Sequence, residues 1–402
     1  MEVRKKVLIM GQIPKEFGGT YTTGVGNVIV SYLNEMDSNA WSCAMFASNL
    51  RGNDKTHTLP YMVYGISLST MVKGFVLWLF NGPSVGCRIK YYKRFGVSWK
   101  KGLVHEWILS EILRRENPNI IHVHNSGLYP VIKAFNLTKP VILTFHGIFS
   151  SDEHSIAENM ARGIDLKKLM TGIGMNAPEK VTVLTQSMKV QVVEELGILR
   201  DKIHVISNGI NQFFFYDLDA RLSLRREMSI DVNDYLFISV GALTKRKNHI
   251  AAIEFLRNSQ LKYTYIIIGK DGDHSSQVRE LASEEPSVRL IEYVDNSELY
   301  RYYSASDAFI LPSTKEGQAL VALEALACGL PVIVNQDIFD SLDCPKSFND
   351  SLYAVNMSRT MDDVSFTKLK TAERKILSKK SISEFSWKEI SKLYMDLYEK
   401  AF

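Results

Sequence analysis

The chain has 402 residues, of which 46% are hydrophobic and 23% charged, an ordinary globular composition that is long enough for two large domains. The net charge of +4 is too small to indicate nucleic-acid binding by itself. No run of 18 apolar residues is present, and the longest candidate, residues 71–80, is interrupted by Lys73 and Gly74, so no membrane-spanning helix is predicted.

Cysteine usage and the N-terminus both favour a cytoplasmic protein. The four cysteines have neither metal nor disulfide spacing, so we expect reduced thiols. The apolar run at residues 7–10 is too short for a signal peptide and is followed by Gly-Gln-Ile-Pro. We therefore interpret it as a first buried strand.

Strand and helix patterns alternate through the first half of the chain. Strands are predicted at residues 7–10, 41–46, 120–124, 141–145, 181–184 and 203–206, with helices near 27–35, 104–116 and 187–196, whereas residues 50–103 are less regular. A loop containing Gly18-Gly19 and Gly24-Val25-Gly26 follows the first strand, and glycines there allow the backbone to approach a phosphate or an acceptor closely. We favour Gly18 and Gly19 for this contact; the alternative is that they only shape the turn.

A second alternating set follows turn chemistry at residues 207–209. Its strands are predicted at residues 235–240, 263–268, 288–291, 308–311, 331–334 and 352–355. Two such sets predict an α/β fold of two Rossmann-like, doubly wound parallel sheets that face each other across a cleft. We predict domains at 1–206 and 207–380, followed by an amphipathic helix at 381–402.

Residues 308–334 carry the clearest candidate site. They indicate a strand, a glycine-containing loop, a helix from about Ala319 to Gly329, and a second strand. Free N–H groups at such a helix start favour an anion. Glu324 can reach back toward a ligand bound there, because helical side chains lean toward the N-terminus.

Six further patterns occur in a fixed order. They are PNIIHVHN (118–125), VILTFHG (141–147), KIHVISNGIN (202–211), SVGALTKRKNH (239–249), the pair Glu316 and Glu324 with seven residues between them, and FSWKEISKLYMDLYE (385–399). Together they resemble the retaining glycosyltransferases of family 4, group 1 enzymes with the GT-B fold. The resemblance covers most of the chain except residues 50–103, and it implies that the last helix returns to the N-terminal domain.

The resemblance implies a nucleotide-sugar donor bound mainly by the C-terminal domain. It assigns Glu316 to the donor sugar's hydroxyls and Glu324 to the ribose, roles that suit carboxylates because they accept paired hydrogen bonds. The alternative to ribose binding is that Glu324 is an ordinary surface residue of its helix. The donor-binding segment also includes Gly317, Gln318, Ala319, Leu320 and Val321.

The resemblance also indicates catalytic groups outside that segment. Lys247 matches the family lysine, and a cation there neutralises a diphosphate leaving group. The family arginine is replaced by Ala242, so we expect Arg246 or Lys245 to supply the missing charge; otherwise this is a solvated basic turn. His146 is implied to contact the donor sugar near the reacting carbon, and the alternative is a histidine that merely ends a strand.

No cofactor and no obligatory metal are expected. Asp271-Gly272-Asp273 mimics a DxD metal motif, but it follows a strand where the resemblance expects a glycine turn. His122 and His124 point to one face of a strand, yet no third ligand has suitable spacing. We therefore favour satisfied core or rim histidines over a metal pair.

Residues 88–101, RIKYYKRFGVSWKK, combine six basic residues with four aromatics and no acid. This mixture suits an anionic membrane surface or an acceptor carried on a lipid diphosphate, with residues 71–80 as an adjoining apolar wedge. The alternative is a solvated face of an insertion. The partners predicted are a nucleotide sugar, a glycan or lipid-linked acceptor and a peripheral membrane contact at the inner face of the cell membrane, without nucleic acid.

The sequence thus predicts a cytoplasmic retaining glycosyltransferase that uses a nucleotide sugar, by resemblance in surface-polysaccharide biosynthesis. A nucleotide-sugar epimerase or phosphorylase shares the two-domain architecture and is the alternative enzyme. A non-catalytic family member that acts as a binding subunit is the alternative outside catalysis, and Ala242 is the residue that favours it.

Overall fold

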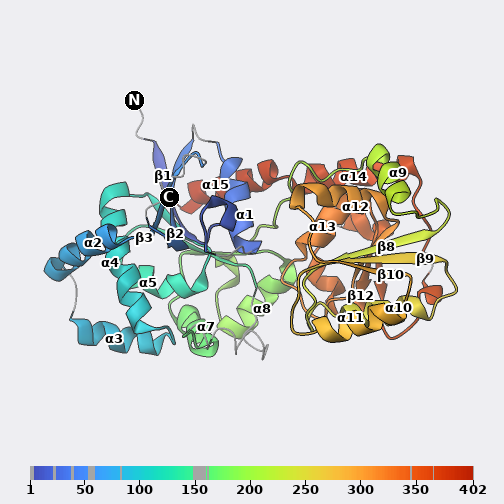
Figure 1. Ribbon diagram of the computed structural model, residues 1–402. Coiled ribbons are helices and arrows are strands. Elements are labelled where there is room, and N and C mark those ends of the chain that lie inside the picture. The colour runs from blue at the N-terminus through green and yellow to red at the C-terminus, as the bar shows by residue number, and fades with distance from the viewer. Residues whose placement is uncertain are drawn as a thin grey trace. The chain divides into compact units, whose positions relative to one another are not determined.

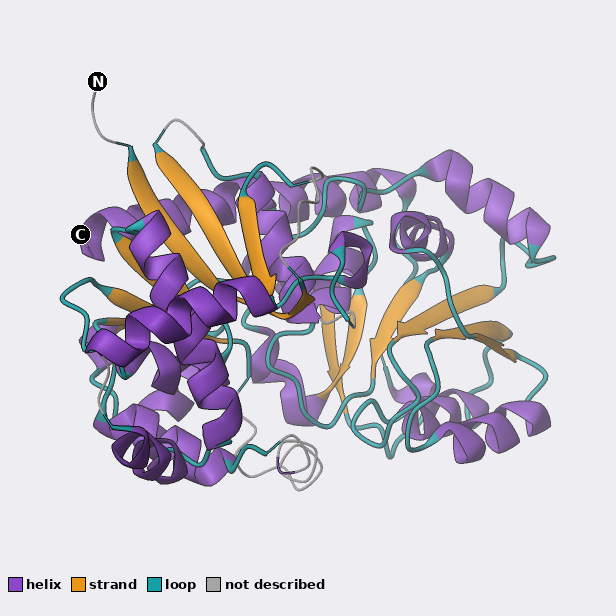
Figure 2. Cartoon of the chain, turned by 60° about the vertical axis from the view of Figure 1, so that its left-hand side comes forward, coloured by secondary structure: helices purple, strands orange, loops and turns teal. Residues whose placement is uncertain are grey.

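The computed structural model describes residues 4–20, 24–37, 40–52, 59–81, 84–147, 160, 163–344, 346–364 and 366–401. The chain forms two compact units, Met1–Ser207 with Ile390–Phe402, and Asn208–Glu389. The sequence places the corresponding boundaries at 207 and 381, whereas the contacts place them at 208 and 390. Each unit contains its own sheet with helices packed against it (Figures 1 and 2).

The first unit is built on a seven-stranded parallel sheet with the order β3-β2-β1-β4-β5-β6-β7. Its strands are β1 (Lys5–Gly11), β2 (Trp41–Arg51), β3 (Met62–Ile66), β4 (Ile120–Val123), β5 (Val141–Phe145), β6 (Lys180–Val183) and β7 (Ile203–Val205). Its helices are α1 (Gly24–Asn34), α2 (Leu68–Asn81), α3 (Val85–Arg94), α4 (Trp99–Glu116), α5 (Tyr129–Lys133), α7 (Leu166–Met175), α8 (Gln186–Leu196) and, from Ile390 onward, α15 (Trp387–Ala401). Because the strands are parallel, the carboxyl ends of β4 and β5 meet at one edge.

The second unit is built on a six-stranded parallel sheet with the order β10-β9-β8-β11-β12-β13. Its strands are β8 (Tyr235–Val240), β9 (Tyr263–Ile268), β10 (Val288–Ile291), β11 (Ala308–Leu311), β12 (Val332–Asn335) and β13 (Leu352–Val355). Its helices are α9 (Leu218–Glu227), α10 (His249–Arg257), α11 (Ser275–Glu284), α12 (Leu299–Ala305), α13 (Leu320–Ala327) and α14 (Thr371–Phe385). Leu236 and Ile238 of β8 join one core cluster and Phe237 another, because successive strand residues point to opposite faces, so this sheet is buried on both sides.

The predicted fold class is confirmed, since both sheets are parallel and packed against helices. The structure gives β5, β8, β9, β10, β11 and β13 the bounds expected from their apolar runs. The less regular residues 50–103 contain β3, α2, α3 and the start of α4. The sequence did not indicate α2 as a helix because apolar residues occupy two of its faces, which hides the helical period.

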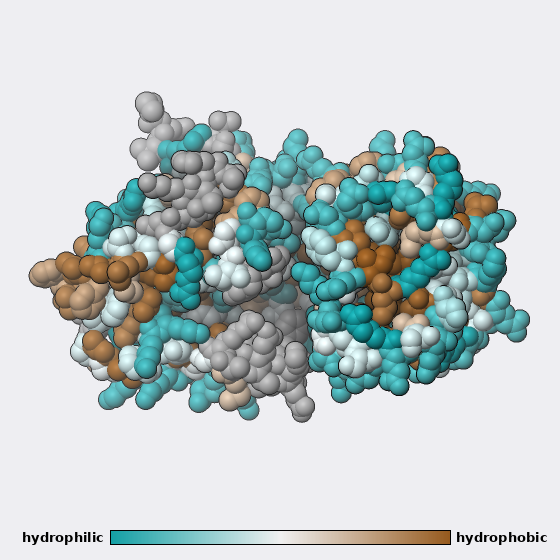
Figure 3. All heavy atoms as spheres, in the orientation of Figure 1, coloured by the Kyte–Doolittle hydropathy of each residue, from teal (hydrophilic) through white to brown (hydrophobic). Residues whose placement is uncertain are grey.

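One face of α2 packs on α4 and another face is exposed. A methyl group on Gly74 would lie 1.6 Å from the carbonyl oxygen of Trp107, and the indole of Trp78 donates to Glu106 at 3.0 Å. The outer side carries exposed apolar side chains at helical spacing, which we call the α2 stripe: Leu68, Val72, Val76, Leu79 and Phe80. Figure 3 shows apolar side chains gathered over α2. In the described part of the chain, no helix combines the length and apolarity needed to cross a bilayer.

The single helix predicted for residues 381–402 is wrong, because the chain breaks at Ser386. This residue is extended (φ −65°, ψ 143°) and ends α14, and its carbonyl oxygen accepts from the amide of Glu389 in the first turn of α15. The amide of Ile210 donates to the carbonyl of Phe385 at 2.7 Å. Both residues belong to the second unit, so the first and last segments of that unit lie beside each other.

Candidate functional site

Three charged side chains meet at the carboxyl ends of β8 and β11, which are neighbours in the sheet. Lys247 Nζ lies 2.7 Å from Glu316 Oε1, and Arg246 Nη1 lies 3.1 Å from Glu316 Oε2. The carbonyl of Arg246 also accepts from the amide of Thr314, which ties the two loops together. The structure thus brings together Lys247, Arg246 and Glu316, three residues that the sequence analysis singled out.

The environment of Glu316 keeps it ionised. Its side chain is only 8% exposed, and burial alone would raise its pKa. The charges of Lys247 and Arg246 outweigh burial and hold the pKa of Glu316 below its ordinary value. Two cations on one carboxylate leave a net positive charge, and this suits an anionic ligand.

Arg246 and Lys245, the two expected replacements for the family arginine, differ in what their groups contact. Ala242 is exposed in the same loop, and Lys245 contributes its backbone amide to Asp273 at 3.0 Å. Of these two side chains, the one that contacts Glu316 is that of Arg246, through its guanidinium group. The stem of Lys247 packs over Gly241, where an added methyl group would lie 3.1 Å from the lysine side chain.

The loop after β11 leads into α13 without a capping side chain. Ala319 precedes the first turn and has no side-chain acceptor, and the amides of Leu320 and Ala322 bond the carbonyls of Gln318 and Ala319. The positive end of the helix dipole still suits an anion. Gly317 and Ala319 are buried, whereas Leu320 and Val321 are half-buried. The Gln318 side chain accepts from the amide of Asn208 at 2.8 Å, a link to the start of the second unit that the sequence analysis missed.

Glu324 on α13 lies in a less charged environment than Glu316. The hydroxyl of Tyr303 donates to Glu324 Oε2 at 3.3 Å, and burial raises the pKa of Glu324 to about 7. Glu324 therefore changes charge near neutral pH. Tyr303, fully buried on α12, was missed by sequence reasoning because nothing in its local pattern distinguishes it from a core aromatic.

His146 follows β5 in the first unit and contacts His124, which follows β4. His124 Nδ1 lies 3.0 Å from His146 Nε2, and the two rings stack with centroids 5.3 Å apart. His122 bonds Thr144 and Tyr398, both at 2.7 Å. His122 and His124 are buried and hydrogen-bonded, as favoured over a metal pair. Burial lowers the pKa of His146 to about 4, so its ring is neutral at pH 7.

Gly18 and Gly19 lie in a tight turn after β1 that requires glycine at both positions. Gly18 has φ +93°, and a methyl group on Gly19 would lie 2.1 Å from the carbonyl oxygen of Ile13. These constraints explain both glycines without a ligand. Their contact with the donor stays a prediction.

The Asp271-Gly272-Asp273 segment is a turn, as expected. Asp271 Oδ1 pairs with Arg279 at 2.7 Å, and Asp273 accepts from the amide of Lys245. Within the described ranges, no group of three or more His, Cys, Asp or Glu side chains is arranged to hold a metal ion.

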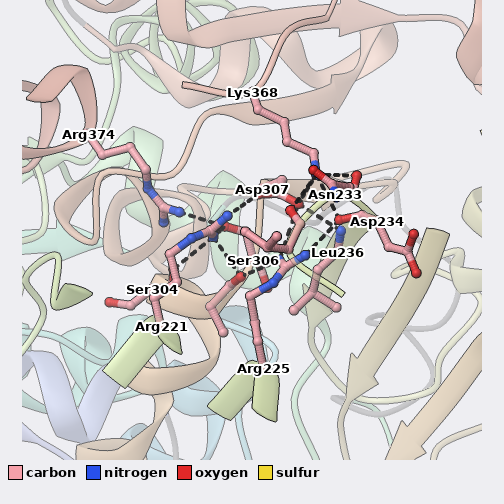
Figure 4. A network of polar contacts seen from close by, with 12 residues as sticks. Arg221, Arg225, Asn233, Asp234, Leu236, Ser304, Ser306, Asp307, Lys368 and Arg374 are labelled. Atoms are coloured by element: carbon pink, nitrogen blue, oxygen red, sulfur yellow. Dashed lines mark hydrogen bonds and ion pairs between the residues drawn. The ribbon is translucent and has the colours of Figure 1, made fainter. Parts of the chain in front are cut away.

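A network of arginines surrounds Asp307, which directly precedes the N-terminal end of β11. Arg221 Nη2 lies 2.6 Å from Asp307 Oδ1 and Arg225 Nη1 lies 3.4 Å from Asp307 Oδ2 (Figure 4). Arg374 donates to the carbonyls of Ser306 and Gly329 at 2.8 and 3.0 Å, near the C-terminal ends of α12 and α13. The network therefore joins α9, α12, α13 and α14 behind the strand that leads to Glu316.

The sequence matches two family models. Residues 23–212 match Glycosyltransferase Family 4, and residues 221–339 match Glycosyl transferases group 1. Between them the two models cover most of both units.

Two curated relatives illustrate the similarity. One is the alpha-monoglucosyldiacylglycerol synthase of Acholeplasma laidlawii, 26% identical over 312 residues, which are 72% of this chain and 78% of the relative. The other is the UDP-Gal:alpha-D-GlcNAc-diphosphoundecaprenol alpha-1,3-galactosyltransferase of Escherichia coli, 26% identical over 238 residues. That match spans 56% of this chain and only 60% of the Escherichia coli protein.

A solved structure supports the fold. The structure of Anabaena Alr3699/HepE in complex with UDP aligns over 98% of this chain and 100% of its own, with a TM-score of 0.70 and 14% identity. At that identity the similarity concerns the fold alone. With its two parallel-sheet units and two matching family models, the chain belongs to the group 1 glycosyltransferases of family 4 and has the GT-B fold.

Proposed function

We propose that this protein transfers a sugar from a nucleotide-sugar donor to a glycan or lipid-linked acceptor, with retention of anomeric configuration. The observation that carries the proposal is the Lys247–Glu316–Arg246 cluster. As the donor breaks, negative charge develops on the departing diphosphate, and preorganised cations stabilise it best. The start of α13 has no side-chain cap, and the positive end of its helix dipole favours the same anion.

Glu316 and the two cations have complementary roles in this proposal. A diphosphate competes with Glu316 for Lys247 and Arg246, because phosphate oxygens form the same charge-assisted hydrogen bonds. The carboxylate released from the cations then accepts hydrogen bonds from the donor sugar's hydroxyls. Glu324 holds the ribose, and His146 contacts the sugar, as the family resemblance implies.

Retention is supported by the family resemblance. In this proposal Glu316 is engaged by the hydroxyls of the donor sugar and does not act as a covalent nucleophile, so we propose substitution on the face that the diphosphate leaves. The anomeric configuration of the product, read by NMR at early times, tests this. An inverted product would contradict it.

The names of the relatives support a lipid-linked acceptor, and the family resemblance is the basis for proposing a role in surface-polysaccharide assembly. One relative is named for a diphosphoundecaprenol-linked acceptor and the other for a diacylglycerol glycolipid. We propose an acceptor of this class for the present chain, bound mainly by the first unit.

We also propose that the α2 stripe rests on an anionic membrane, where such acceptors reside. Leu68 and Phe80 at its two ends are 72% and 83% exposed, a degree unusual for contiguous apolar side chains. The following helix, α3, presents exposed Lys90, Lys93 and Arg94. Apolar side chains beside cations suit a surface of anionic lipid.

Vesicle binding tests the membrane contact. The protein should sediment with vesicles that contain anionic lipid and bind far less to neutral ones, and Val76→Asp with Phe80→Asp should abolish binding. Ile376→Asp, a similarly exposed apolar position in the second unit, is the matched control. Equal binding by both variants would contradict the proposal.

Activity assays with nucleotide sugars test the transferase. Glu316→Ala and Lys247→Ala should each strongly slow product formation, whereas Lys262→Ala, an exposed lysine remote from the cluster, should not. Epimerisation of the donor or phosphorolysis without acceptor would favour the alternative enzymes instead. If both cluster variants kept full transfer activity, the assignment of the site would be wrong.

We further propose that no metal ion is required. Two fixed cations can neutralise the diphosphate, and both carboxylates of the Asp271-Gly272-Asp273 turn are occupied by protein donors. Activity should survive EDTA, and a strict dependence on added Mg²⁺ or Mn²⁺ would contradict this.

A further inference from the structure

A chain of hydrogen bonds leads from Tyr32 to His146 inside the first unit. The Tyr32 hydroxyl lies 3.2 Å from His124 Nε2, and His124 Nδ1 lies 3.0 Å from His146 Nε2. Tyr32 is fully buried and His124 nearly so. Both ring nitrogens of His124 are therefore used, and the nitrogen of His146 left for another partner is Nδ1.

His124 and His146, the two histidines in this chain of hydrogen bonds, are neutral at pH 7. Burial holds the pKa of His124 well below its ordinary value and lowers the pKa of His146 to about 4. A neutral imidazole donates with one nitrogen and accepts with the other. Once the direction of the bond from Tyr32 is set, the tautomers of both histidines follow from it.

The surroundings of Tyr32 favour one direction. Its hydroxyl has a second neighbour, the hydroxyl of Tyr398, at the longer distance of 3.5 Å. An imidazole nitrogen is the better acceptor of a phenol proton and is also nearer, so Tyr32 donates to His124 Nε2. His124 then carries its proton on Nδ1 and donates to His146 Nε2, and this leaves the proton of His146 on Nδ1.

We propose that Tyr32 and His124 are positioning residues that hold His146 as its Nδ1–H tautomer. In this form His146 offers an N–H donor to an oxygen of the substrate and does not act as a base. A hydrogen-bond donor suits a sugar hydroxyl or a phosphate oxygen. The part of the proposal that concerns substrate rests on the proposed function, whereas the tautomer does not.

The tautomer is measured directly on the full chain labelled with ¹⁵N-histidine. Long-range ¹H–¹⁵N spectra at pH 7 should show His146 with a protonated Nδ1 and an unprotonated Nε2, assigned by the loss of its signals in His146→Gln. The reverse pattern would overturn the proposal.

The variant Tyr32→Phe removes the phenol proton and keeps the ring. His124 Nε2 then loses its donor, so the signals of His146 should shift toward the Nε2–H form. The kcat/KM for the donor should fall roughly three- to tenfold, the effect of one neutral hydrogen bond. His124→Gln should lower activity at least as far.

Tyr129→Phe is the matched control, because its hydroxyl is also buried in the first unit and donates to the carbonyl of Asn176, outside the Tyr32–His124–His146 chain. It should lose comparable thermal stability while the His146 signals and kcat/KM stay unchanged. A fall in activity in Tyr32→Phe with an unchanged His146 tautomer would overturn the positioning role. An inactive wild-type protein with the Nδ1–H tautomer would instead contradict the proposed function and leave the tautomer intact.

Discussion

At the scale of single residues, we propose that Arg246 supplies the positive charge of the family arginine, whose position is occupied by Ala242 in this chain. Lys247 is 15% exposed and Arg246 41% exposed, and the less exposed charge interacts more strongly with a ligand. Lys247→Ala should therefore lower kcat by about 10²–10³-fold, the range for losing one preorganised group that stabilises developing charge. Arg246→Ala should cost less, roughly tenfold.

The double variant Ala242→Arg with Arg246→Ala checks that explanation. If Arg246 stands in for the missing cation, an arginine at position 242 should restore part of the activity in steady-state assays with a nucleotide sugar. Ala242→Gln in the same background controls for side-chain size. If Ala242→Arg restored no more activity than Ala242→Gln, Arg246 would not be a replacement for the family arginine.

The raised pKa of Glu324 leads us to predict that donor binding depends on pH. Its pKa of about 7 means that part of the population is protonated at neutral pH, whereas ribose hydroxyls donate best to the ionised form. Nucleotide binding should therefore release protons near pH 7, and affinity should rise from pH 6 to pH 8 and then level off. Calorimetry in two buffers of different ionisation enthalpy measures the protons released. Glu324→Gln should bind more weakly and lose the pH dependence, and an unchanged profile would remove Glu324 from the ribose site.

At the scale of elements, the arginine network around Asp307 should govern the stability of the second unit. Burial would raise the pKa of Asp307, but Arg221 and Arg225 hold it below the ordinary value. The folded pKa is then lower than the unfolded one of about 3.9, so this stabilisation is present above that pH and is lost as pH falls through the folded pKa.

Asp307→Asn leaves buried guanidinium groups without their carboxylate and should destabilise the unit by about 3–5 kcal/mol at pH 7. The difference from wild type should begin to shrink below about pH 4, where the carboxylate protonates in the unfolded chain, and should disappear only below the lower pKa of the folded state. Denaturant unfolding at several pH values measures it. Asp271→Asn, which breaks the exposed pair with Arg279, is the control and should cost about 1 kcal/mol or less. Equal losses in the two variants would contradict the role of the network.

The elements also show what the sequence could predict. The apolar runs of β8, β9 and β11 are buried on both faces, so composition alone locates them. The Lys247–Glu316 pair was predictable because both residues follow neighbouring strands of one parallel sheet. Tyr303 and the Asp307 network were not, because their partners are distant in sequence and only packing brings them together. The outer face of α2 was suggested as a wedge, but its helix was hidden by apolar residues on both faces.

At the scale of the whole molecule, the C-terminal residues belong to the first unit although they follow the second. Tyr398 bonds His122 at 2.7 Å, and Glu399 accepts from the indole of Trp41 at 2.9 Å. Both contacts are made with strands that the N-terminal half contributes. The second unit is therefore inserted between two parts of the first, and the core of the first unit is complete only after residues 390–402 have been made.

Deleting residues 390–402 should separate the stabilities of the two units. Because Tyr394 and Tyr398 are buried in the first unit, the deletion exposes its core, while the clusters around β8 keep their own contacts. Calorimetry should show a lowered or missing transition for the first unit and a nearly unchanged one for the second. Tyr398→Ala should shift the same transition less, by about 3–5 kcal/mol, and Leu393→Ala, half exposed on the same helix, should shift it little. Equal shifts of both transitions would mean that the units unfold together, and a shift confined to the second unit would contradict the placement of the C-terminal helix.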